Sequence, residues 1–165
     1  MTNALWILGA CLAALPATLG AGELVVDDFE DGNLESKLGL AWMVIADHVV
    51  GGGSAAQLEV ATAGEPRALT LTGDRRKVES LPVSFVGAWT AVGDDGRARD
   101  VSEYEGLRLR ARAPSGRFQA GLRRAGANVN YSAPIELGPE WTDVDVPFAS
   151  LEPLGPRGLL KSPPL

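Results

Sequence analysis

The stretch GLRLRARAPSGRFQAGLR, residues 106–123, decides the fold. Apolar and polar residues alternate with a period of two on both sides of a Pro-Ser-Gly turn, which is the pattern of half-buried strands. The alternation returns in residues 141–148. The residues expected to face the core are Leu107, Leu109, Ala111, Phe118, Ala120, Leu122, Val144 and Val146. The pattern therefore predicts a β-sheet with one buried face.

Shorter patterns extend this prediction along the chain. We expect further strands at residues 24–26, 41–46, 68–73, 83–89 and 128–136. Beyond the N-terminal apolar segment, no ten-residue stretch has a helical period, and the 20 glycines and 11 prolines fit many turns. The sequence therefore predicts an all-β fold in which two antiparallel sheets pack as a β-sandwich.

The composition excludes several classes of function. With 15 Lys+Arg, 21 Asp+Glu and a net charge of -6, the chain offers little to a polyanion, so nucleic acid is not an expected partner. One cysteine, Cys11, and one histidine, His48, are too few for a Cys/His zinc site, a CxxC redox pair or an intrachain disulfide. The 165 residues suffice for one domain but not for two ordinary cores.

The N-terminal segment has a different character from the rest. Residues 4–22 are uncharged and mostly apolar, and the first charged residue is Glu23. Small residues at the end of this run predict a secretory signal peptide at residues 1–21, and hence a secreted or periplasmic protein. An uncleaved anchor is the alternative, because no Lys or Arg precedes the run and its length just spans a bilayer. The β-sandwich would then occupy residues 22–153, with a Pro/Gly-rich tail at 154–165.

Two motifs carry a resemblance to a known family. The spacing Trp-x4-Asp-x3-Gly-Gly-x-Ser at residues 42–54 resembles the signature of the complex I intermediate-associated protein 30 family, and the late strand ending in Pro-Phe is similar to the family's own. The motif residues are Trp42, Asp47, Gly51, Gly52, Ser54, Pro147 and Phe148. The resemblance implies a galactose-binding-like jelly-roll β-sandwich and, in mitochondria, a role in assembling respiratory complex I. A fold alone does not transfer that role to an exported protein.

The glycines of this motif and the end of the chain lead to two further expectations. Gly51 and Gly52 should occupy conformations or positions that a side chain resists. Members of the family usually have one or two more strands after Pro-Phe, whereas here the chain runs through Pro-rich sequence to Leu165. We therefore expect a closing strand to be absent, which leaves a sheet edge that another chain can complete.

A polar sheet face opposite the core is the main candidate binding site. Its members are Arg108, Arg110, Arg112, Gln119, Arg123, Asn128, Asn130, Asp143 and Asp145, with Trp141 at the rim. Long hydrogen-bonding side chains beside an aromatic ring resemble a sugar- or peptide-binding surface. The alternative is a solvated face with cross-strand Arg/Asp pairs, each worth roughly 0.2–1 kcal/mol. We assign Trp42 and Trp89 to the core.

The sequence also contains candidates for a metal site and for a hydrolytic site. Asp28 and Glu30 lie in an acidic turn whose oxygens are suited to a structural Ca²⁺, although a solvated turn is the alternative. A hydrolase would need His48 with Asp47 and Ser54, but neighbours in a strand point to opposite faces and no G-x-S-x-G elbow is present. We therefore predict that the chain is not an enzyme.

The functional prediction follows from these points. We expect a secreted, non-catalytic binding or assembly-factor-like domain that recognises a protein partner. A carbohydrate-binding module for a polysaccharide is the alternative, and a hydrolase is the third hypothesis. No nucleic acid and no membrane contact beyond the signal segment are expected.

Overall fold

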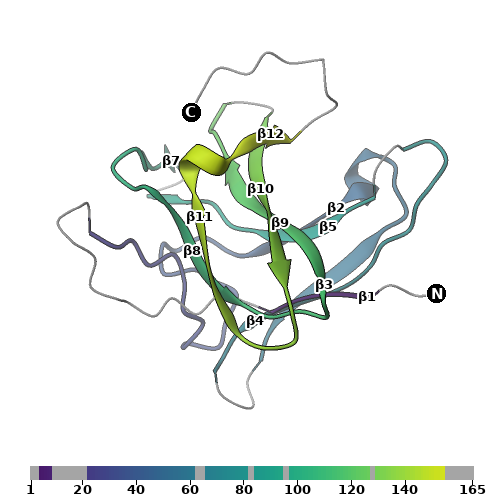
Figure 1. Cartoon of the computed structure of the whole chain (residues 1–165), viewed down its shortest axis with the longest axis horizontal. Coiled ribbons are helices and arrows are strands. Elements are labelled where there is room, and N and C mark those ends of the chain that lie inside the picture. Colours follow the sequence, from purple (N-terminus) through teal and green to yellow (C-terminus); the bar gives the residue numbers. More distant parts are fainter. Residues whose placement is uncertain are drawn as a thin grey trace.

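The computed structural model describes residues 4–8, 22–61, 66–81, 84–94, 97–126 and 129–154, with only the backbone described at 4–8, 94, 97 and 154. The strands of these residues pair antiparallel throughout, which confirms the predicted all-β class (Figure 1). Two 3-10 turns, η1 (Asp47–Val50) and η2 (Phe148–Ser150), supply the helical geometry of this part of the chain. Among the described residues there is no helix with the length and apolar character needed to cross a membrane.

The C-terminal unit, residues 106–154, contains the stretch that decides the fold. β8 (Gly106–Ala111) pairs with β11 (Thr142–Pro147), while β9 (Gly116–Arg123) pairs with β10 (Asn130–Leu137). In Figure 1, β8 lies beside β11 and β9 lies beside β10. The Pro-Ser-Gly turn at 114–116 therefore carries the chain from one pair of strands to the other.

The core of this unit lies between the two pairs. Its buried members are Ala111, Ala113, Phe118, Ala133, Ile135, Leu137 and Val146, and the partly buried residues packed against them are Leu107, Leu109, Ala120, Val144 and Leu151. Both pairs contribute their inner faces, so the unit is a small sandwich. The predicted core face is confirmed except for Leu122, which is half-buried and lies outside this cluster.

The N-terminal unit, residues 22–98, has a second, smaller core. β2 (Met43–Ala46) pairs with β5 (Val86–Trp89), and β3 (Ala55–Val60) pairs with β4 (Leu69–Asp74). Its apolar cluster consists of Ala46, Leu71 and Val86, with Val44, Ala56 and Leu58 packed against them. A short hairpin of β6 (Gly93–Asp94) and β7 (Arg97–Ala98) follows.

Three features differ from the sequence-based expectation. Residues 24–26 lie in irregular chain and not in a strand. β3 and η1 were not predicted. Residues 57–60 do alternate polar and apolar side chains, and this signal could have revealed β3, whereas η1 is a single turn, too short for a periodic pattern. One short strand, β12 (Glu152–Leu154), follows the Pro147-Phe148 pair and lies antiparallel to β10, where we expected an open sheet edge.

The ends of the chain are only partly described. Of residues 1–21, where we predict a signal peptide, Ala4–Leu8 form β1, which is antiparallel to β4, and the remainder lies outside the described residues. Residues 155–165 of the predicted tail also lie outside them. Signal peptide, cleavage and domain limits therefore stay predictions.

Candidate functional site

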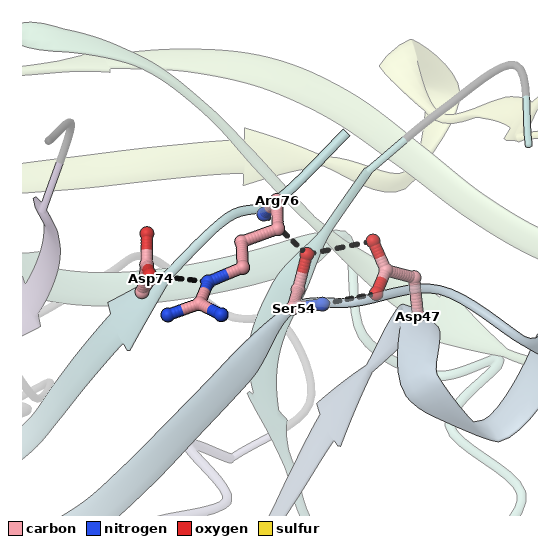
Figure 2. A network of polar contacts seen from close by, with 4 residues as sticks. All are labelled: Asp47, Ser54, Asp74 and Arg76. Carbon is pink, nitrogen blue, oxygen red and sulfur yellow. Dashed lines mark hydrogen bonds and ion pairs between the residues drawn. The ribbon is translucent and has the colours of Figure 1, made fainter. Parts of the chain in front are cut away.

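A buried carboxylate organises the family motif. Asp47, the first residue of η1, has no exposed surface, and its carboxylate accepts hydrogen bonds from Ser54 N (2.8 Å), Ser54 Oγ (2.7 Å) and Phe85 N (3.2 Å). Figure 2 shows Ser54 between Asp47 and Arg76, whose backbone N–H donates to Ser54 Oγ (3.0 Å). The carboxylate thus joins η1, the loop after it and the chain before β5, and Ser54 extends this network to Arg76, two residues after the end of β4.

Two glycines make room for this arrangement. Gly51 has a φ of 90°, in the left-handed region that favours glycine, and it ends η1. Gly52 N donates to the Asp47 carbonyl (2.8 Å), and a Cβ at Gly52 would lie 2.2 Å from Asp47 Oδ1. The expectation that both positions resist a side chain is confirmed, with a different physical reason for each.

The charge state of Asp47 follows from its donors. Burial alone would raise the pKa of Asp47, but the hydrogen bonds from Ser54 and Phe85 outweigh this effect and hold the pKa below its ordinary value. The Ser54 hydroxyl donates a hydrogen bond to this carboxylate, and His48 is exposed to solvent. Asp47 and Ser54 therefore form a structural anchor, and the exposed His48 lies outside it.

A second buried carboxylate holds the first loop. Asp27 is 3% exposed and accepts hydrogen bonds from Phe29 N (2.8 Å) and Trp42 Nε1 (2.7 Å). Burial raises the pKa of Asp27, in contrast to Asp47. The rings of Phe29 and Trp42 are in tilted contact with centroids 5.7 Å apart. Trp42 of the family motif is therefore half-buried and anchors the loop, as expected for a core residue rather than a ligand platform.

In the acidic turn, the Asp28 carboxylate has a partner within the chain. Asp28 forms an ion pair with Lys37, which lowers the pKa of Asp28, and it also accepts a hydrogen bond from Glu30 N (3.3 Å). The Glu30 carbonyl accepts a hydrogen bond from Arg67. Throughout the described ranges, no group of three or more His, Cys, Asp or Glu side chains is arranged to hold a metal ion. The predicted calcium site at Asp28 and Glu30 therefore receives no geometric support.

The arginine row of β8 faces carboxylates of β11. Arg108 is paired in register with Asp145, and its Nε and Nη2 donate to the two carboxylate oxygens at 2.6 and 3.2 Å. Arg110 is opposite Asp143, with 3.9 Å between Arg110 Nε and Asp143 Oδ1. Both arginines thus have a cross-strand counter-charge within the chain.

The third arginine of the row lies on an aromatic ring. The guanidinium carbon of Arg112 is 4.8 Å from the centroid of the Trp141 ring, within the range of a cation–π contact. The predicted rim aromatic is therefore covered by a side chain of the same face. Arg108 and Arg112 thus have partners on their own face, whereas Arg110 Nε is buried and 3.9 Å from Asp143 Oδ1, without a hydrogen bond.

The other predicted face residues lie on the second pair of strands. Gln119 and Arg123 belong to β9, Asn130 on β10 is in register with Arg123, and Asn128 lies outside the described residues. Because the inner faces of β8–β11 and β9–β10 share one core, their outer faces point away from each other. The prediction of a single shared face is wrong, since alternation assigns a face within a strand but does not say which strands pair.

An exposed apolar feature was missed. The large hydrophobic residues exposed in the described chain are Met43, Val49, Val50 and Trp89. Met43 and Trp89 are opposite each other in the β2–β5 pair, and Trp89 is 44% exposed. The assignment of Trp89 to the core is wrong, because Val86 and Ala88 take the inward positions of β5 and leave Trp89 outside. Alternation along residues 86–89 was the signal that could have revealed this.

The late motif residues have a local role. Pro147 ends β11 in register with Gly106, and Phe148 N donates to the Glu105 carbonyl (2.8 Å) as η2 begins. A Cβ on Gly106 would lie 2.6 Å from the Val146 carbonyl oxygen, so the strands approach too closely there for a side chain. Pro147 and Phe148 therefore end the pairing of β11 with β8.

The fold and these anchors define a β-sandwich whose family motif is structural. A family model described as complex I intermediate-associated protein 30 matches residues 28–160, and the chain belongs to this family. No curated protein and no solved structure matched the chain. Membership suggests an assembly-factor-like, non-catalytic domain and, in general, a protein partner.

Proposed function

We propose that this chain is an exported, non-catalytic domain that binds a protein partner and acts as an assembly factor. The observation that carries the proposal is the family match over residues 28–160. Export is proposed from the uncharged apolar run at residues 4–22. Asp27 and Asp47, the buried carboxylates of the described chain, are both engaged in holding loops, which supports a role in binding rather than in catalysis.

A protein partner has more support than a polysaccharide. A sugar site needs an open aromatic ring with free polar groups beside it. The Trp141 ring is covered by Arg112, and Arg108 is bound to Asp145. Trp89 is exposed, but its cross-strand neighbour is the apolar Met43. The rings of Trp89 and Trp141 therefore lack the surroundings of a sugar subsite.

Affinity purification of the tagged full chain from its native cells tests the proposal. We expect one protein to co-purify in a fixed ratio and to rebind when both are purified separately. Tryptophan fluorescence should not change with soluble polysaccharides. A saturable fluorescence change with a polysaccharide and no co-purifying protein would refute the proposal in favour of a carbohydrate-binding module.

Mass spectrometry of the intact protein tests export separately. We expect the mature N-terminus between Ala17 and Glu23, because the small residues of the apolar run end there. Full-length mass in the membrane fraction would establish an anchor instead.

A further inference from the structure

β4 is the middle strand of a three-stranded sheet whose order is β1-β4-β3. Every residue of β1 is paired antiparallel with β4, from Ala4 opposite Asp74 to Leu8 opposite Thr70 (Figure 1). β1 lies within the apolar segment that precedes the mature N-terminus we expect after export. Removal of that segment therefore takes away the strand that covers one edge of β4.

β4 has the composition of an interior strand and not of an edge strand. Its first five residues, Leu-Thr-Leu-Thr-Gly, include no charged residue and no proline. Edge strands in native proteins are usually protected against further pairing by charges, prolines or bulges. Such residues are present in the other outer strands of the two three-stranded sheets, namely Glu59 in β3, Arg117 and Arg123 in β9, and Glu152 and Pro153 in β12. Without β1, the outer side of β4 is therefore an unprotected edge.

One face of β4 borders the smaller apolar core. Leu71 has no exposed surface and belongs to that cluster. A Cβ at Gly73 would lie 3.0 Å from Val86 Cγ2, and Val86 is a member of the same cluster. Residues directly opposite each other in paired strands share a face of the sheet. A strand beside β4 therefore places its residues opposite Leu71 and Gly73 toward the core, where apolar side chains are favoured.

We propose that the β4 edge, the side of residues 70–74 that pairs with β1, accepts an extended apolar segment of the protein partner once the N-terminal segment has been removed. The partner segment pairs antiparallel with β4 through main-chain hydrogen bonds and has apolar residues opposite Leu71 and Gly73. This inference rests on the proposed function, and it adds the contact surface and the kind of segment that the partner supplies.

The strand that the structure places on this edge indicates the chemistry of the occupant. The sequence of β1, Ala-Leu-Trp-Ile-Leu, is apolar at all five positions, and it pairs with residues 70–74 one for one. The β4 strand of a second copy would instead bring Thr70, Thr72 and Asp74 to the edge. It would also join two chains that each have a net charge of -6. An apolar segment of a different protein therefore fits the edge better than a second copy does.

Hydrogen exchange of the exported form, purified from its native cells, tests whether the edge is open and accepts a strand. The probe is a peptide with the sequence of β1 and two lysines at each end for solubility. The control peptide has Trp6→Pro and Ile7→Pro, because adjacent residues of a strand donate to opposite sides and one of the two prolines must remove a donor to β4. We expect the probe to slow the fastest-exchanging amides of residues 69–74 by about tenfold or more, and the control to leave them unchanged. Exchange in β9, another sheet edge, should be unchanged by either peptide.

The purified partner is then tested on the same edge. We expect it to protect residues 69–74 and to be displaced by the β1 peptide but not by the two-proline control. Thr72→Lys, which places a charge beside the edge, should weaken partner binding by about tenfold. Gln57→Lys is the matched control, because Gln57 is exposed and lies opposite Thr72 on β3, and it should leave binding unchanged. If Thr72→Lys lowers the melting temperature, displacement by the peptide is the deciding measurement.

The outcomes separate the edge from the function. A full-length mass for the exported protein means that β1 is retained, which overturns the edge proposal and leaves partner binding standing. A β1 peptide that does not protect residues 69–74, or a partner that binds without protecting them, has the same consequence. A dimer of the exported form that is protected at residues 69–74 gives the edge to a second copy and also overturns the proposal. The absence of any co-purifying protein overturns the proposed function and, with it, this occupant.

Discussion

The N-terminal and C-terminal units of this molecule are stabilised by different interactions. In the C-terminal unit, apolar side chains from alternate positions of β8, β9, β10 and β11 meet in one core, and the outer charges pair across strands. In the N-terminal unit the apolar cluster is smaller, and two buried carboxylates hold the loops between its strands. The comparison shows that an aspartate can organise irregular chain where no periodic pattern is present.

The reason lies in the hydrogen-bonding needs of loops. Strands satisfy their N–H groups by pairing, but buried loop N–H groups need another acceptor. A carboxylate can accept several of them, and hydrogen bonds to a charged acceptor are stronger than neutral ones. Asp47 accepts hydrogen bonds from the backbone N–H groups of Ser54 and Phe85. Asp27 accepts one from Phe29 N and one from the indole N–H of Trp42. Substitutions in each unit can test whether the two units depend on these different interactions.

The largest expected effect is in the apolar core. Phe118→Ala removes a ring that is 6% exposed at the centre of the C-terminal cluster, so we expect a loss of about 3–5 kcal/mol in unfolding free energy. Urea denaturation followed by fluorescence measures it. The adjacent Gln119→Ala is the control and should have little effect, because that side chain is exposed. A loss under about 1 kcal/mol would contradict the assignment of this core.

The next effect is in the motif loop. Gly52→Val places a side chain where the Asp47 carboxylate lies, so we expect a loss on the order of 1–3 kcal/mol. Gly138→Ala is a matched control, since a Cβ there meets nothing within 4 Å. Thermal unfolding measures both variants. An unchanged midpoint in Gly52→Val would mean that the loop does not depend on the carboxylate.

A smaller effect should distinguish the two carboxylates by pH. The pKa of Asp47 is lowered, so its contribution to stability is present above the ordinary aspartate value of 3.8 and is lost as the pH falls through the folded-state pKa. The pKa of Asp27 is raised, so its contribution is present below 3.8 and is lost as the pH rises through its folded-state pKa.

Melting temperatures of Asp47→Asn and Asp27→Asn between pH 7 and pH 2.5 would show this difference. These limits lie roughly three units above and one unit below the ordinary aspartate pKa. As the pH falls, the gap between wild type and Asp47→Asn should shrink, while the gap between wild type and Asp27→Asn should widen. Parallel curves for the two variants would mean that both carboxylates have the same environment.

The smallest effect is expected on the charged face. Arg110→Glu places like charges opposite Asp143, so the melting temperature should fall by no more than roughly 5 °C. Adding Asp143→Lys should restore part of the loss. A melting temperature that stays the same in both variants would show that this pair is merely solvated. The pair of Arg108 and Asp145, with two hydrogen bonds, should be more sensitive than the looser Arg110 pair.

Much of the C-terminal unit could be predicted, and much of the N-terminal unit could not. Alternation along residues 106–123 and 141–148 is a local property, and it identified β8, β9, β11 and the inward residues. The short motif at residues 42–54 indicated the family, but it did not indicate the hydrogen bonds that these residues form. Nothing local shows that Trp42 donates to Asp27, fifteen positions earlier, or that Asp47 binds Phe85 N.

The sequence by itself determined the all-β class, the strands with clear alternation, the family, and the two glycines of the family motif that resist a side chain. The tertiary structure decided which strands pair, and this alone placed Asp145 opposite Arg108 and separated Gln119 from the arginine row. It also decided that Trp89 is exposed and that Trp141 is covered. The physical reason is that side-chain direction follows from neighbouring residues along a strand, whereas partners and burial depend on segments that meet only after folding.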